Sequence, residues 1–400
     1  MLMTETVHPS GEIQHRLKPF FAQLGRFHST PALKRSSLFA SLESEIERVL
    51  ASVAEETFAG EEGQAAALSI RAVAWNIERG TNLEGILEAF RTHAALQGSD
   101  LLLLTEVDLG MARTGNRHIA REIGSALGYN YAFAPCYIAL NKGSGLESAV
   151  SGENEQALHG NALFSRHPLL EAHSLAIPNG KDLMWGKEKR LGSQRAVIAT
   201  IDHPTGAFRA VSLHLDAHSS QRHRWRQMRI VLDHLESLRP ALPVLIGGDW
   251  NTSTYDSSRA SYTILGYCRR VLMGVRNVLQ NHYPYPDRWF ERHIFRGLEK
   301  RGYEYRSLNE PGACTLHYNI DDLAANHRMA DWIPQWCFWF INWALQKNDG
   351  RCSIKLDWFA GKGISPDAED PPRVAGEVHE ERAFLSDHDP IVLTFRLESR

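Results

Sequence analysis

The sequence predicts a mixed α/β protein built around a large β-sheet core. Three observations lead to this fold class. Short β-rich runs recur from residue 68 to the end of the chain, helical patterns separate only some of them, and 43% of the 400 residues are apolar, with 23% charged. This balance is that of a soluble globular protein, and it excludes a collagen, a coiled-coil rod and a largely disordered chain. The length is ample for a large core.

Residues 1–66 are expected to form a helical N-terminal extension. Phe39, Leu42, Ile46 and Val49 recur at helical spacing with glutamates between them. An Ala-Gly-Glu-Glu-Gly stretch near residue 60 is typical of a linker. We therefore expect the main domain to occupy residues 67–400.

Within that domain the β-rich runs predict strands and the intervening amphipathic patterns predict helices. The predicted strands, in order, are 68–75, 100–105, 129–135, 160–165, 195–201, 209–215, 243–247, 354–360 and 391–396. The predicted helices are 83–97, 117–127 and 221–238. Many strands with few helices favour a large sheet core over a simple alternating βα fold.

An insertion is expected at about 253–350, where the rhythm of strands is lost. Residues 259–310 hold ten Lys or Arg against five acids, which suits either a solvated surface or an electrostatic guide for a polyanion. Trp332, Trp336, Trp339 and Trp343 then follow at helical spacing. This face is expected to pack on the core; the alternative is an apolar wall for a lipid tail or a membrane surface.

Composition excludes several other functions. The longest apolar run is six residues, 336–341, so no transmembrane helix is expected, and no secretory signal is visible. The five Cys show no Cys-x-x-Cys spacing and are expected to be reduced thiols of a cytoplasmic protein. With a net charge of −3, affinity for nucleic acid would need a local basic face.

Polar residues adjoin the apolar runs at their ends, where α/β scaffolds usually present a site. They are Asn76, Glu78, Glu106, His159, Asn161, His214, Asp249, Asn251, Asp357 and Ser386 to Asp389. Each alone could be a turn former or a core polar residue. Together they supply what metal-assisted phosphoester hydrolysis needs.

The carboxylates suit a hard cation, because Mg²⁺ prefers oxygen ligands and needs only one or two carboxylates. Glu106, Glu78 and Asp387 are the candidate metal ligands. Asp249 and Asn251 could orient an attacking water.

Hydrogen-bond donors are needed for the charge that develops on the phosphate. His214, Asn76 and His388 could supply them, with Asp357 aiming His388. Arg195, at the start of a predicted strand, is a further candidate for substrate contact, and so are His159 and Asn161.

Seven motifs in order resemble the endonuclease/exonuclease/phosphatase superfamily. They are Trp75-Asn76-Ile77-Glu78, Leu-Leu-Thr-Glu106, His159-Gly160-Asn161-Ala162-Leu-Phe-Ser-Arg166, Ser212-Leu-His214-Leu, Gly247-Gly-Asp249-Trp-Asn251, Leu356-Asp357-Trp and Ser386-Asp387-His388-Asp389-Pro390. The resemblance covers roughly residues 68–252 and 352–397 and implies a four-layer α/β/β/α sandwich of two mixed sheets with helices outside.

The resemblance also implies roles for the site residues. Glu106 would be the principal ligand of Mg²⁺ or Mn²⁺, with Asn76, Glu78 and Asp387 in or next to the coordination shell. Asp249 and Asn251 would position or deprotonate water. His214 and the His388–Asp357 pair would stabilise the phosphorane-like charge, although His388 is also a candidate base. Glu78 stands where many nucleases of the family have Asp, and the inositol-phosphatase signature Pro-Ala-Trp-Cys-Asp-Arg is absent.

The expected function is therefore that of a divalent-metal-dependent phosphohydrolase, most simply a nuclease-like phosphodiesterase. The alternatives are a sphingomyelinase-like phospholipid phosphodiesterase, a phosphomonoesterase, and a non-catalytic binding protein on the same fold. The substrate is left open between nucleic acid and phospholipid, and no obligate protein partner is evident. Walker, dinucleotide-binding, zinc-protease and serine-hydrolase motifs are all absent from the sequence.

Overall fold

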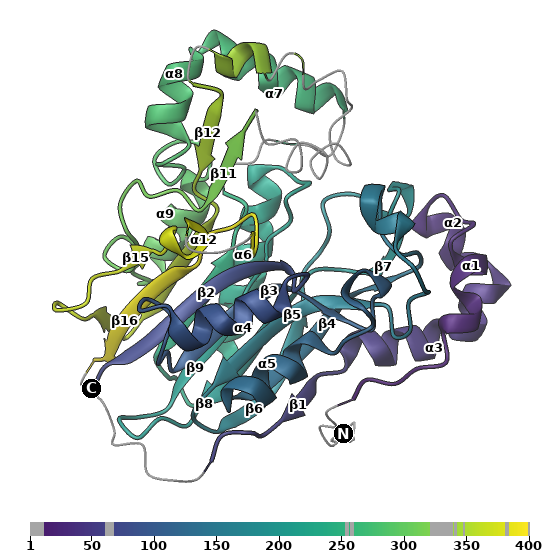
Figure 1. Cartoon of the computed structure of the whole chain (residues 1–400), viewed down its shortest axis with the longest axis horizontal. Coiled ribbons are helices and arrows are strands. Elements are labelled where there is room, and N and C mark those ends of the chain that lie inside the picture. The colour runs from purple at the N-terminus through teal and green to yellow at the C-terminus, as the bar shows by residue number, and fades with distance from the viewer. Residues whose placement is uncertain are drawn as a thin grey trace.

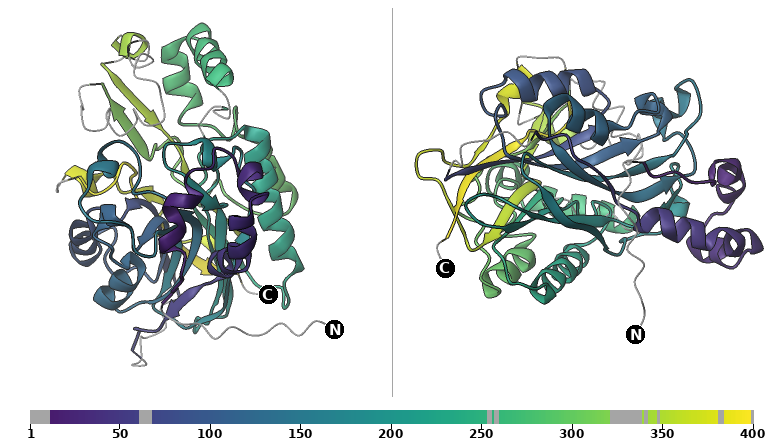
Figure 2. Two further views of the ribbon diagram at one scale, coloured as in Figure 1. Left: turned by 90° about the vertical axis from the view of Figure 1, so that its right-hand side faces the viewer. Right: turned by 90° about the horizontal axis from the view of Figure 1, so that it is seen from below.

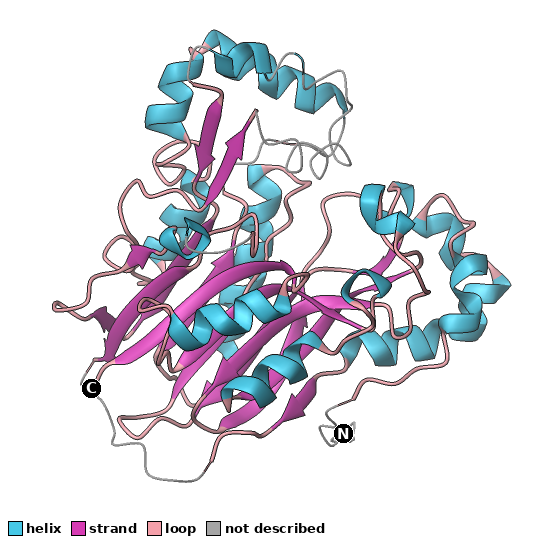
Figure 3. Cartoon of the chain, viewed as in Figure 1, coloured by secondary structure: helices cyan, strands magenta, loops and turns pink. Residues whose placement is uncertain are grey.

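Two β-sheets form the centre of the computed structural model, as Figures 1 and 3 show. The structure describes residues 12–60, 68–252, 256, 260–320, 339, 342–346, 349–380 and 384–398. Seven strands of the larger sheet follow the order β1-β4-β5-β3-β2-β16-β14, while β7 pairs with β4 and β15 with β16. The smaller sheet has the order β13-β10-β9-β8-β6.

Strand bounds in the larger sheet are β1 Ala54–Glu56, β2 Ile70–Arg79, β3 Leu101–Leu109, β4 Asn130–Ala139, β5 Leu158–Ser165, β7 Arg190–Gly192, β14 Ile364–Pro366, β15 Arg373–Val374 and β16 Ile391–Leu397. Those in the smaller sheet are β6 Leu169–Ala176, β8 Arg195–Ile201, β9 Phe208–Ser212, β10 Val244–Asp249 and β13 Asp357–Lys362. Every predicted strand is present, although its ends differ by a few residues. β1, β6, β7, β14 and β15 were not predicted.

The two sheets pack face to face and carry helices on their outer faces, as the right-hand view of Figure 2 shows. Strand alternation produces these layers, because successive side chains point to opposite faces. In β2, Ala72 and Ala74 lie in the core between the sheets. Val73 and Trp75 lie in the outer core, the apolar cluster between the larger sheet and the helices that cover its outer face. The outer core on the larger sheet includes side chains of α4 (Leu83–Thr92) and α5 (Ile119–Leu127), while α6 (Gln221–Ser237) and α9 (Arg292–Lys300) cover the smaller sheet. The predicted four-layer sandwich is therefore confirmed.

The segment expected to be an N-terminal extension packs on the larger sheet. It holds η1 (Lys18–Phe20), α1 (Phe21–Leu24), α2 (Thr30–Lys34), α3 (Ser37–Ala51) and β1, whose three residues pair with β4. Apolar residues of α3, such as Phe39, Ile46 and Val49, join the same buried cluster as the outer face of the sheet. The domain boundary at residue 66 stays a prediction.

The insertion forms a separate lobe beside the sandwich in Figure 1. The described elements of the lobe are α7 (Ala260–Leu272), α8 (Val275–Asn277), η5 (Val278–His282), β11 (Leu316–Asn319) and β12 (Arg351–Ile354), whereas α9, which follows η5 in the chain, packs on the smaller sheet. Trp339 and Trp343 are 67% and 55% exposed, so the expectation that these two indoles pack on the core is wrong; Trp332 and Trp336 lie outside the described residues. Across the described helices, none combines the length and apolar character needed to span a bilayer.

The candidate active site

Strand direction brings the predicted site residues to one edge of the sandwich. β2 and β3 run parallel, as do β9 and β10, so the residues at their carboxyl ends face the same edge. β16 and β13 run antiparallel to β2 and β10, so the residues at their starts lie at that edge too. Asp249, the last residue of β10, pairs directly with Asp357, the first residue of β13.

Asn76 links site residues of the two sheets through hydrogen bonds. Its Nδ2 donates to Glu106 Oε1 of the larger sheet and to Asp249 Oδ2 of the smaller one, each at 3.2 Å. Its Oδ1 accepts from the backbone N–H of Glu78 at 3.1 Å. Ser386 Oγ, from the loop before β16, donates to the backbone oxygen of Asn76 at 2.6 Å. A single amide thus fixes two carboxylates that are far apart in sequence.

Backbone strain is concentrated at this edge. Glu78, Arg79, Glu106 and Asn251 all have positive φ, at 43°, 68°, 54° and 53°. The pairing registers of β2 and β3 shift at these same positions. Such conformations cost about 1–3 kcal/mol each for residues other than glycine and cluster at functional sites. Here they turn the Glu78 and Glu106 side chains away from regular strand geometry.

Asp357 and His388 form a buried pair. His388 Nδ1 donates to Asp357 Oδ2 at 2.7 Å, and Thr315 Oγ1 donates to the same oxygen at 2.6 Å. His388 Nε2 then lies 3.8 Å from Asp249 Oδ2. Burial alone would lower the pKa of His388, but the Asp357 and Asp249 carboxylates outweigh it and raise the pKa well above its usual range. The imidazolium form is therefore favoured in this arrangement.

His214 and Asn251 complete the smaller sheet's contribution. His214 Nε2 lies 3.5 Å from Asp249 Oδ2. The Asn251 backbone N–H donates to Asp249 Oδ1 at 2.9 Å, and its Nδ2 donates to the Leu215 carbonyl at 2.9 Å. Asp249 therefore receives contacts from Asn76, Asn251 and two histidines, which makes it the hub of the cluster.

The candidate metal ligands differ in their surroundings. Glu106 is half-buried; burial would raise its pKa, but Arg79 in particular, with His214 and His159, lowers it below the usual range and keeps the carboxylate charged. Glu78 is buried and Asp387 is exposed. These oxygen donors suit a hard cation. Donor atoms of Asp249, Asp357 and His388 also lie within 4.8 Å of one another, a second arrangement that could hold a metal ion.

A buried charge network beside Glu106 was not predicted from the sequence. Arg113 Nε donates to Asp108 Oδ2 at 2.7 Å, and its Nη1 lies 3.1 Å from both Glu147 and Glu188. His159, a predicted substrate contact, has its Nδ1 2.8 Å from Asp108 Oδ1. Arg79 Nε lies 3.2 Å from Glu147 Oε1 and is the strongest cation acting on Glu106. The network therefore holds His159 and Arg79, the two groups whose positive charge acts on Glu106 from this side.

Substituting Arg113 by Met is expected to lower the free energy of unfolding by about 3–5 kcal/mol, because it leaves Asp108 buried without its guanidinium partner. Glu188 also loses one of its two arginine partners and keeps Arg190. The Arg113 side chain is 1% exposed. Arg117→Met is the matched control, since Arg117 pairs with Glu84 and Glu122 at the surface and should cost about 0–1 kcal/mol. Urea denaturation of both variants measures the difference. Equal losses would mean that the buried network contributes no more than a surface pair.

Asn161 and Arg195 lie next to each other, since Asn161 Nδ2 donates to the Arg195 carbonyl at 2.8 Å. Arg195 Nε donates to Ser174 Oγ of β6 at 2.9 Å. Among the described contacts none joins either side chain to Glu106, Asp249 or His388. Their contact with substrate stays a prediction.

Fold and site together define a phosphoester hydrolase built on the four-layer sandwich. Residues 73–388 match the family described as the Endonuclease/Exonuclease/phosphatase family, which is most of the chain. The protein therefore belongs to the endonuclease/exonuclease/phosphatase family, as its motifs predict. A search of curated proteins gave no match.

Solved structures with a similar fold share little sequence with this chain. An endonuclease/exonuclease/phosphatase from Beutenbergia cavernae is 17% identical, with 83% of this chain and 72% of that chain covered and a TM-score of 0.49. The human Nocturnin catalytic domain with bound sulfate is 14% identical, covering 87% and 97%, with a TM-score of 0.44. The 3'-5' exonuclease from Neisseria meningitidis is 14% identical, covering 82% and 100%, with a TM-score of 0.45.

Proposed function

We propose that this protein is a divalent-metal-dependent phosphodiesterase that uses a bound water as nucleophile. The observation that carries the proposal is the Asn76 bridge, which holds Glu106 and Asp249 at one edge of the sandwich. A cation-binding carboxylate and a water-binding carboxylate must be this close if both are to act on one phosphate.

Glu106, with Glu78 and Asp387, would hold Mg²⁺ or Mn²⁺. When bound, the ion would act as a Lewis acid on a phosphoryl oxygen and offset its developing charge. We favour this set over the second group, Asp249, Asp357 and His388. In that group His388 Nδ1 and Asp357 Oδ2 already bond to each other, so these two atoms are not free to bind an ion.

The remaining residues would handle water and charge. Asp249 and Asn251 would hold the attacking water in line with the leaving group, and Asp249 is the candidate acceptor of its proton. His214 Nε2 and His388 Nε2, which both face Asp249, would donate to the phosphate oxygens. Asp357 would keep His388 oriented and charged, as carboxylates do for catalytic histidines.

Metal removal tests this proposal directly. With Mg²⁺ or Mn²⁺ the purified protein should hydrolyse an aryl phosphodiester faster than an aryl phosphomonoester, excess EDTA should abolish turnover, and added Mg²⁺ should restore it. Turnover that is unchanged in EDTA would refute metal dependence. An absence of hydrolysis for all phosphoesters would favour a non-catalytic binding protein.

A phospholipid substrate remains the second candidate, because Trp339 and Trp343 of the insertion are exposed. The substrate panel should therefore include sphingomyelin beside single-stranded DNA, double-stranded DNA and RNA. Raising the salt concentration separates the classes, since binding to a nucleic-acid backbone weakens steeply with salt whereas burial of lipid tails does not.

A further inference from the structure

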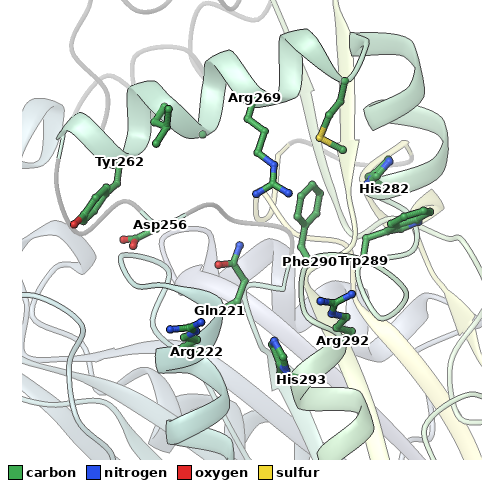
Figure 4. A pocket seen from close by; sticks show the side chains of 13 residues that line it. Gln221, Arg222, Asp256, Tyr262, Arg269, His282, Trp289, Phe290, Arg292 and His293 are labelled. Atoms are coloured by element: carbon green, nitrogen blue, oxygen red, sulfur yellow. The ribbon is translucent and has the colours of Figure 1, made fainter.

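A pocket of about 550 Å³ lies between the start of α6 and the insertion lobe. Figure 4 shows Gln221 and Arg222 on one side of it, Arg269 of α7 opposite, and Trp289, Phe290 and Arg292 along the third side. The motifs of the candidate active site do not include any of these residues. The pocket lies where α6 of the sandwich meets the insertion.

Positive charge converges on this pocket. Arg222, Arg269 and Arg292 all line it, and none of the three has a carboxylate partner among the residues that the structure describes. Asp256 is the single acid among the described residues that line it. Elsewhere in the described chain, arginines such as Arg113 and Arg224 are paired with acids. Three guanidinium groups around one hollow form a site for an anion with more than one negative group.

Aromatic rings form one wall of the same pocket. Trp289 is 52% exposed, and its ring centroid lies 4.5 Å from that of His282, at an interplanar angle of 31°. His282 in turn lies 5.4 Å from Phe290. His282 is buried, yet its Nδ1 has no hydrogen-bond partner in the described part of the chain. The wall thus offers the half-exposed Trp289 indole as a flat stacking surface.

The pocket is close to the candidate active site along the chain. Asp256 follows Asn251 by five residues, so their Cα atoms are at most about 18 Å apart. Arg222 follows His214 by eight residues, through the loop that leads from β9 into α6. A polymer with its scissile phosphate at Asp249 would need only a few further nucleotides to span such a distance.

We propose that this pocket binds nucleotides that flank the scissile phosphate of a single-stranded polynucleotide. The arginines would neutralise successive phosphates and Trp289 would stack on a base, which is how proteins hold single strands without reading their sequence. A lipid headgroup with one phosphate would leave most of the guanidinium groups unpaired. The inference rests on the proposed phosphodiesterase function and assigns it a substrate class.

Fluorescence anisotropy with a labelled twelve-nucleotide oligothymidylate tests whether the pocket binds a single strand. EDTA is present so that no turnover occurs. Arg269→Ala and Trp289→Ala should each raise the Kd about tenfold, and Trp289→Phe should restore most of the affinity. Arg269→Ala should also reduce the slope of log Kd against log salt by about 0.7. Arg276→Ala, at an exposed arginine of the same lobe that does not line the pocket, is the matched control and should bind like the wild type.

Three results would overturn the assignment: no binding of the oligonucleotide by the wild type, unchanged affinity in both alanine variants, or an equal loss in Arg276→Ala. A loss of binding to phosphatidylglycerol vesicles in the alanine variants, with oligonucleotide binding unchanged, would assign the pocket to lipid instead. Because binding is measured without metal, these results are separate from the hydrolysis assay. Failure of the wild type to hydrolyse any phosphoester refutes the proposed function. Kd values for the oligonucleotide that are unchanged in both alanine variants refute the proposed role of the pocket.

Discussion

Glu106→Gln is expected to lower kcat/KM for phosphodiester hydrolysis by about a thousandfold, since a metal's charge stabilisation is worth several kcal/mol. Glutamine keeps the shape and the contact with Asn76 Nδ2, but it removes the negative charge that faces the cation. Arg79 keeps a second anionic partner in Glu147, so the fold should survive the substitution. The loss should therefore fall on metal binding and turnover.

Steady-state kinetics and calorimetric titration with Mg²⁺ check this prediction, and circular dichroism verifies folding. Glu47→Gln provides the matched control, because it removes the same charge from an exposed position on α3. It should leave both turnover and Mg²⁺ affinity unchanged. Near-normal activity of Glu106→Gln would remove this residue from the metal site.

The fold could be predicted because most core strands are apolar on both faces. β3 and β10 are buried along almost their whole length, and such runs are visible without any structure. β6 lacks that signal, since all of its residues are partly or wholly exposed at the edge of its sheet. β1 has only three residues and is defined by its pairing with β4. Helix 83–97 was predicted too long, because Ala94, Ala95 and Leu96 continue an apolar pattern after α4 has ended at Thr92.

The cluster around Asp249 could be predicted because each member directly adjoins an apolar strand. Its supporting contacts could not, since they join residues that are distant in sequence. Thr315, which donates to Asp357, comes from the insertion 42 residues away, and Arg113 meets Glu188 across 75 residues. Charged residues in loops give no sequence signal of which partner they will meet. The exposed Trp339 and Trp343 show the same limit, because helical spacing identifies a face without identifying what covers it.

The Asp357–His388 pair is expected to act as one catalytic unit. Asp357→Asn should lower kcat about a hundredfold and His388→Gln about a thousandfold, magnitudes in the range found when an orienting carboxylate or a catalytic histidine is removed. Independent contributions would multiply to a loss of about 10⁵ in the double variant. We expect instead that the double variant resembles His388→Gln alone within a few-fold, because Asp357 reaches the site only through the Nδ1 hydrogen bond.

The double-mutant cycle has a built-in control in Thr315→Val, which removes a hydrogen bond to the same Asp357 oxygen and leaves His388 in place. Its loss should be about tenfold or less, because His388 still holds the carboxylate in position. Both of these donors bind Asp357 Oδ2, and Oδ1 has no donor among the described residues, so the orientation of the carboxylate depends on His388, Thr315 and its own strand. Losses that multiply would mean that Asp357 acts on the substrate or the metal directly, and the carboxylate would then belong with Asp249 in the group of metal-binding candidates.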